Sequence, residues 1–352
     1  MRTVGIPIAS LCAALAWTTA SAAGEAGAPG RRLRVVTTLP DYADFVTRIG
    51  GDRVTVQAIV RGDQDAHFIR PKPSFVAAVR EADLLVATGL DLELWLPTVV
   101  DKSGNRRVRS GEPGYVAAAQ GMPLLEKPEV MSRAEGGVHI HGNPHVTNSP
   151  VQMKVAVRNI AAGLARNDPG GAELYRRNAK ALADEFDKRL FGDELVKMFG
   201  GPTLCKLAAD GKLVPFLKGH KYKGEPLIGR LGGWCGRMLP LHGTRAVTYH
   251  KNWVYFMRLF GMEEAGTVEP KPGIPPVPRH VTGLIRQMKE QKIGIILAAN
   301  YFDEQKVKTV AARTGARAVI VPLYVGGAEG VGDYFSLVDH WVDRILAAAR
   351  RD

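Results

Sequence analysis

Short β-branched segments alternate with single helical segments along this chain, and this alternation constrains the fold more than any other feature. Residues 33–39, 54–60 and 82–88 resemble strands, and helical patterns at 41–49 and 73–81 separate them. Strands joined by single helices pair in parallel, so this part predicts an α/β lobe. The pattern resumes later, with strands expected at 246–249, 265–268, 293–299 and 318–322 and helices at 253–260, 279–291, 305–314 and 334–349.

The middle of the chain is helical. Two helices are expected, at 150–166 and 169–190. In the second, Leu174, Ala181, Leu182, Phe186 and Leu190 recur at spacings that favour one helical face. We therefore expect two similar α/β lobes with parallel sheets joined by a long spine helix, with a metal site between the lobes. The predicted parts are an N-terminal lobe at 31–168, a linking helix at 169–191 and a C-terminal lobe at 192–352, with a Gly-, Lys- and Pro-rich insertion at about 200–239.

The first 23 residues have the three-part pattern of a secretory signal. Arg2 precedes an almost uncharged apolar run at 4–17, and small residues follow at 18–23. The apolar run is too short for a permanent membrane anchor, so we expect cleavage after Ala22 or Ala23 and a periplasmic protein. The formal net charge of +12 comes from scattered Lys and Arg residues rather than a basic stripe, which argues against nucleic acid as a partner.

Two cysteines, Cys205 and Cys235, remain after removal of the signal segment, which carries Cys12. In an oxidising compartment a pair of cysteines predicts one disulfide, the alternative being two separate buried thiols. Neither cysteine lies in a C-x-x-C spacing, so a zinc site built on this pair is not expected.

Three of the nine histidines lie where an α/β fold places ligand groups. His67 follows the second predicted strand, His250 ends a later one, and His145 closes a Gly-rich segment that also contains His139 and His141. Loops at the carboxyl ends of parallel strands form binding sites, and convergent imidazoles suit Zn²⁺. The remaining four histidines are expected to have packing or surface roles: His220, His242, His280 and His340.

Over residues 33–350, apart from the insertion, the chain resembles the cluster A-I substrate-binding proteins of zinc and manganese ABC importers. The fragments that carry the resemblance are residues 67–74, 82–93 with Trp95, 143–145, 249–256 with Phe260 and Gly261, 314–315, and 332–335 with Leu337. The resemblance implies a protein that captures a metal ion between its lobes and hands it to a membrane permease, without chemical turnover. We expect it to act as a monomer.

The same resemblance implies four metal ligands, namely His67, His145, His250 and Asp333. The aspartate that usually precedes Pro-His in the family is Asn143 here, and the long His-rich loop is reduced to His139 and His141, which are candidate auxiliary ligands. A third histidine at position 250 favours Zn²⁺ over Mn²⁺, because Mn²⁺ prefers more oxygen ligands.

Two other functions are compatible with parts of the sequence. The segment 139–145 superficially resembles the His-x-His-x-Asp-His run of metal-dependent hydrolases, but Asn143 replaces the aspartate and Pro144 shifts the last histidine out of register. A periplasmic metallochaperone or an adhesin on the same fold is the other alternative.

Overall fold

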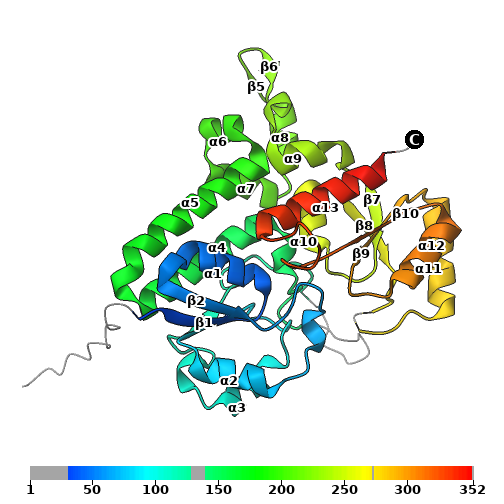
Figure 1. The fold of residues 1–352 in the computed structure, drawn as a ribbon. Coiled ribbons are helices and arrows are strands. Elements are labelled where there is room, and N and C mark those ends of the chain that lie inside the picture. Colours follow the sequence, from blue (N-terminus) through cyan, green and yellow to red (C-terminus); the bar gives the residue numbers. More distant parts are fainter. Residues whose placement is uncertain (1–30, 128–138, 272, 351–352) are drawn as a thin grey trace, which may run out of the picture.

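The computed structural model describes residues 31–127, 139–271 and 273–350, and the predicted signal segment lies outside them. Two four-stranded sheets form the centres of two lobes, and helices cover both faces of each sheet (Figure 1). All strand pairs in both sheets are parallel. The predicted fold class, two parallel α/β lobes, is therefore confirmed.

The N-terminal sheet has the strand order β2-β1-β3-β4. Its strands are β1 (Leu33–Thr37), β2 (Val54–Ala58), β3 (Leu84–Ala87) and β4 (Tyr115–Ala117), and its helices are α1 (Pro40–Gly50), α2 (Pro73–Glu81), α3 (Leu96–Ser103) and α4 (Pro150–Asn167). Every residue of β3 is buried, as expected for a central strand covered on both faces. A proline in the first turn of each helix fixes where the helix begins.

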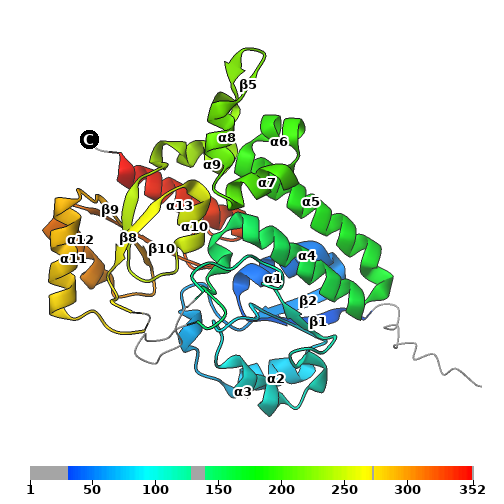
Figure 2. The ribbon, with the colours of Figure 1, turned by 180° about the vertical axis from the view of Figure 1, so that it is seen from behind.

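The C-terminal sheet has the order β10-β9-β7-β8. Its strands are β7 (Arg245–Thr248), β8 (Glu263–Thr267), β9 (Ile295–Ala299) and β10 (Arg317–Val321), and its helices are α10 (Val254–Phe260), α11 (Pro278–Glu290), α12 (Glu304–Thr314) and α13 (Tyr334–Ala349). Figure 2 shows α11 and α12 on the outer side of this sheet, while α10 and α13 lie on the side nearer the rest of the molecule.

Helix α5 (Ala172–Phe191) is the long central helix, and it packs against α1 and α4 on one side and α9 on the other. Leu182, Phe186 and Leu190 are buried as the periodicity predicted. Ala181, expected on the same face, is exposed, because consecutive residues of a helix point about 100° apart and the buried stripe runs through Tyr175, Leu182 and Phe186 instead.

The predicted insertion is more regular than its composition suggested. It consists of short helices and one hairpin: α6 (Asp193–Phe199), α7 (Gly201–Ala209), α8 (Leu213–Gly219), β5 (Lys221–Tyr222), β6 (Glu225–Pro226) and α9 (Gly233–Met238). The hairpin projects from the end of this group, away from both sheets (Figure 1). Glycines with positive φ at Gly192 and Gly200 separate α5, α6 and α7, which explains why a Gly-rich sequence yields several helices.

Cys205 and Cys235 are free thiols in the structure, so the predicted disulfide is not present. The Sγ atom of Cys205 lies 3.4 Å from both Lys154 Nζ and Asp187 Oδ1. Burial raises the pKa of Cys205 to about 12 and also raises that of Cys235. Both thiols therefore stay protonated near neutral pH, the form that reacts poorly in thiol–disulfide exchange. The structure thus matches the alternative of two separate thiols, with Cys235 buried and Cys205 half-buried.

Within the described residues, no helix combines the length and the apolar character needed to cross a bilayer.

The junction before α5 depends on an ion pair that should be sensitive to acid. Asp168 accepts two hydrogen bonds from Arg53, at 2.6 and 2.9 Å, and one from the Tyr175 hydroxyl. The bonds from Arg53 lower the pKa of Asp168, so its stabilising effect is present above the unfolded-state pKa and is lost as pH falls through the lower folded-state value.

We expect Asp168→Asn to lower the free energy of unfolding by about 1 kcal/mol at pH 7 and to have little effect near pH 2. Urea unfolding of the wild type and the variant at both pH values measures this difference. An equal loss at both pH values would show that the charge of Asp168 is not what stabilises the junction.

Candidate metal centre

His67 lies in a 3₁₀ turn, Ala66–Phe68, in the loop that follows β2. Asp65 caps this turn: its Oδ1 accepts hydrogen bonds from the His67 backbone N–H at 3.0 Å and from the His67 ring at Nδ1, 2.8 Å away. Trp95 also holds this turn in place, because its indole N–H donates a hydrogen bond to the Ala66 carbonyl at 2.8 Å. The ring orientation is thus set by a carboxylate two residues earlier in the chain.

His145 precedes α4 and is held in the same way by Asn143. The Asn143 Oδ1 accepts from the His145 backbone N–H at 3.0 Å and from its Nδ1 at 2.9 Å. The amide nitrogen of Asn143 donates to Glu126 Oε2 at 2.9 Å and to the Lys251 carbonyl at 2.6 Å. Asparagine therefore provides the acceptor that orients the histidine, and it also links the two lobes.

His250 follows β7, and its Nδ1 lies 2.7 Å from Glu269 Oε2. Glu269 follows the neighbouring strand β8, where its backbone N–H donates to the Tyr249 carbonyl at 2.9 Å. Adjacent parallel strands β7 and β8 thus bring a histidine and its carboxylate partner to one edge of the sheet.

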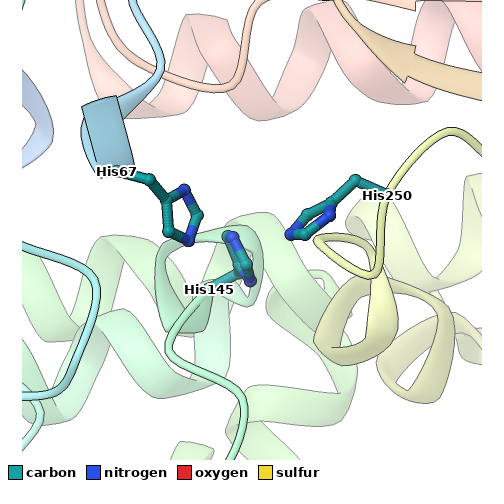
Figure 3. A group of neighbouring side chains, drawn as sticks. All are labelled: His67, His145 and His250. Carbon is teal, nitrogen blue, oxygen red and sulfur yellow. The ribbon is translucent and has the colours of Figure 1, made fainter. Parts of the chain in front are cut away.

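The structure brings His67, His145 and His250 together between the lobes, with one nitrogen from each ring within 4.8 Å of the others. The ring centroids are 5.1 Å apart for His67 and His145, 5.2 Å for His145 and His250, and 5.7 Å for His67 and His250. Figure 3 shows the three rings turned toward one another from three separate segments. Because each Nδ1 has an acceptor, Nε2 is the nitrogen left to bind a ligand.

The chemistry of this cluster suits a cation. The Nε2 atom of His145 is buried and has no hydrogen-bond partner, which is costly unless a ligand occupies the space in front of it. Burial, together with repulsion from the neighbouring imidazoles, lowers the pKa of His145 well below its ordinary value. Its imidazole is therefore neutral and has a free lone pair, the form that binds metals.

The pKa of Asp65 reflects the same arrangement. Burial would raise it, but the hydrogen bond and charge of His67 outweigh burial and leave it below its ordinary value. Asp65 is therefore ionised and acts as the acceptor that raises the basicity of the His67 ring.

Asp333, which family resemblance implied as the fourth ligand, lies elsewhere in the structure. It is the N-cap of α13, where its Oδ1 accepts from the Ser336 backbone N–H at 2.7 Å. Its other oxygen forms an ion pair with Arg48 at 2.7 Å. Asp333 does not belong to the histidine cluster, and both of its oxygens serve to anchor α13.

The two candidate auxiliary histidines differ sharply. His139 Nε2 lies 3.3 Å from His67 Nε2, so this side chain reaches the edge of the cluster. The His141 side chain is 58% exposed, and its nearest charged partner is Asp91 at 4.0 Å. Only His139 is positioned near the three central rings.

Two groups at the site were missed by sequence reasoning. Asp65 stands two residues before His67, as Asn143 stands two residues before His145, so a repeated acceptor-x-His spacing could have revealed its role. Glu269 offers no local signal, because it meets His250 only through the pairing of β7 and β8.

Comparison with known proteins identifies the family of the chain. Residues 35–189 and 237–348 match the family described as zinc-uptake complex component A, periplasmic. The chain belongs to this family. Its members are substrate-binding proteins of metal ABC importers, and the unmatched residues between the two ranges contain most of the inserted helices and the hairpin.

Individual relatives differ in the metal named for them. The chain is 26% identical to the iron-binding protein YfeA of Yersinia pestis over 90% of this chain and 86% of that protein. It is 23% identical to the manganese ABC transporter substrate-binding lipoprotein PsaA of Streptococcus pneumoniae, over 90% and 89% of the two chains. A crystal structure of ZnuA superposes with a TM-score of 0.65 and 21% identity, over 90% of this chain and 99% of that one. The last comparison supports the fold.

Loss of the Asn143 acceptor should weaken metal binding without removing a ligand. We expect Asn143→Leu to lower the zinc affinity about 10- to 100-fold, because His145 would lose the bond that fixes its ring and tautomer. Chelator competition measures this change. Asn105→Leu is the control, since Asn105 bonds backbone carbonyls far along the N-terminal lobe, at Val79 and Ala82. Equal affinities of the two folded variants would contradict the role assigned to Asn143.

Proposed function

We propose that this protein captures Zn²⁺ in the periplasm through His67, His145 and His250 and delivers it to the membrane permease of an ABC importer. The observation that carries the proposal is the convergence of three imidazoles whose Nδ1 atoms are all engaged, with the Nε2 of His145 buried and unpartnered. A metal ion placed among the three Nε2 atoms would satisfy that buried group.

The donor set favours zinc over manganese. Three neutral nitrogen ligands suit Zn²⁺, whereas Mn²⁺ favours carboxylate, carbonyl and water oxygens. Within the described residues, the metal-sized cluster contains no carboxylate, since the nearby Asp65 and Glu269 bind the far sides of two rings. Iron and manganese, named for relatives, therefore fit this set less well.

The bound Zn²⁺ would bridge the two lobes. His67 and His145 belong to the N-terminal lobe and His250 to the C-terminal lobe, so the ion bridges them. The lobes are already joined beside the site: the Tyr255 hydroxyl donates to the Asn143 carbonyl at 2.6 Å, and the Tyr334 hydroxyl donates to the Thr147 carbonyl at 2.5 Å. These buried bonds favour local adjustment of the histidine loops over a wide opening of the lobes.

The test has a binding part and a delivery part. Metal-free protein should bind one Zn²⁺ per chain and prefer it to Mn²⁺ by at least about 100-fold in chelator competition. Cells that lack the protein should take up less ⁶⁵Zn under zinc limitation, and the wild-type gene, but not a His250→Ala gene, should restore uptake. Equal affinity for Mn²⁺ would refute the choice of metal. Normal zinc uptake without the protein would refute delivery to an importer and favour a metallochaperone.

A further inference from the structure

His139 is the one histidine outside the central cluster whose ring reaches it. We propose that His139 supplies a fourth imidazole to the bound ion, in the place where family resemblance implied Asp333, and that this all-nitrogen set makes the site selective for zinc. The inference rests on the proposed function, because it concerns the coordination of the same ion.

The distance between the nearest nitrogens fits a shared metal. Zn–N bonds of about 2.0–2.1 Å in a tetrahedral site place two ligand nitrogens about 3.3–3.4 Å apart. The Nε2 atoms of His139 and His67 are 3.3 Å apart. The ring of His139 lies 5.3 Å from that of His67 and 5.9 Å from that of His145. Its nitrogens are not among those that lie within 4.8 Å of one another, so binding of the shared ion requires the His139 ring to shift toward His145 and His250.

The backbone around His139 is held in place by contacts that leave its Nε2 beside that of His67. The next residue, Ile140, donates its N–H to Asp91 Oδ2 at 3.0 Å, and the His139 ring itself hydrogen-bonds the Asp91 backbone. The Gly142 N–H donates to the His139 carbonyl at 3.1 Å and closes a turn. This turn leads directly to Asn143, which orients His145.

No carboxylate among the described residues competes for the fourth position. Asp333 has one oxygen on the Ser336 N–H and the other on Arg48, so binding a metal would cost the N-cap of α13 and an ion pair. Asp65 and Glu269 face the Nδ1 sides of His67 and His250. The remaining choices for the fourth ligand are His139 and a water molecule.

His141 provides a matched control two residues away. It lies on the same turn and has the same side chain, but it is largely exposed and lies near Asp91 rather than near the other histidines. If zinc affinity depended only on having a histidine somewhere in this turn, replacing either histidine would lower it equally. If His139 is a ligand, only its replacement should lower the zinc affinity.

The experiment compares wild type, His139→Ala, His139→Asp, His141→Ala and His250→Ala, loaded with Zn²⁺ or Co²⁺. We expect zinc-edge X-ray absorption to show four imidazoles in wild type and in His141→Ala, and three in His139→Ala. Zinc affinity should fall at least about 10-fold in His139→Ala and stay unchanged in His141→Ala. His139→Asp should narrow the preference for Zn²⁺ over Mn²⁺, because it restores an oxygen ligand.

The outcomes separate this inference from the proposed function. The role of His139 alone would be overturned if the wild-type protein showed only three imidazoles bound to zinc. It would also be overturned if wild type and His139→Ala bound zinc equally well while His250→Ala bound it more weakly. Failure of wild type to bind zinc, or an unimpaired His250→Ala, would overturn the site itself.

Discussion

Replacement of His145 by alanine is expected to lower the zinc affinity by more than about 100-fold, a loss of at least about 2.7 kcal/mol of binding free energy. His145 is only 3% exposed, its Nδ1 is fixed by Asn143, and its Nε2 has no partner other than the proposed ion. Removal of the ring deletes one of three central ligands, and no neighbouring side chain can replace it. Competition against a chromophoric zinc chelator measures the change.

Two comparisons make this prediction specific. His220→Ala is the control, because His220 is exposed in the insertion and its ring packs on Phe216, far along the chain from the cluster. The free energy of unfolding of metal-free His145→Ala should fall by less than its free energy of zinc binding, because the substitution also removes a buried nitrogen that has no hydrogen-bond partner. Equal zinc affinities for His145→Ala and His220→Ala would exclude His145 as a ligand.

Replacement of Lys154 by methionine should give the largest loss of stability, about 3–5 kcal/mol. Lys154 on α4 forms an ion pair with Asp187 on α5, and the two side chains are only 15% and 8% exposed. Without the lysine, Asp187 would remain as a buried charge against Cys205 and Gly201, where α7 packs on α5. Urea unfolding followed by circular dichroism measures the loss.

The double variant Lys154→Met/Asp187→Leu separates charge from packing. Since replacement of both members of a buried pair by apolar side chains is often close to neutral, the double variant should recover much of the lost stability. Zinc affinity of the folded single variant should stay near that of wild type, because the polar side-chain partners of Lys154 are Asp187 and Cys205 rather than the histidines. A double variant less stable than Lys154→Met would contradict the assignment of the loss to an unpaired charge.

The fold could be predicted from the sequence because the patterns that mark its strands and helices lie within short segments of the chain. Parallel strands such as 84–87 are buried along their whole length and appear as uninterrupted apolar runs, and prolines mark the start of α1, α2 and α4. The insertion was less predictable. Its glycines suggested loops, but Gly192 and Gly200 terminate helices α5 and α6 instead.

The candidate site was accessible where strand ends determine position, as for His67 and His250. Asp333, which family resemblance implied as a ligand, also fits a second pattern, because an aspartate three residues before Ser336 can form a helix capping box, and the structure shows that capping box at the start of α13. His139 and Glu269 could not be placed, because their positions depend on contacts between segments distant in sequence. The predicted disulfide rested on the expected compartment alone, whereas Cys205 lies half-buried beside a lysine and an aspartate.

A crystal structure of the zinc-loaded protein, with anomalous difference maps recorded on both sides of the zinc absorption edge, tests the account most directly. We predict a single strong zinc peak between the lobes, about 2.0–2.1 Å from the Nε2 atoms of His67, His145 and His250. Asp333 should still cap α13 in that structure. A zinc peak that is bound by Asp333, or that lies away from these three histidines, would contradict the account.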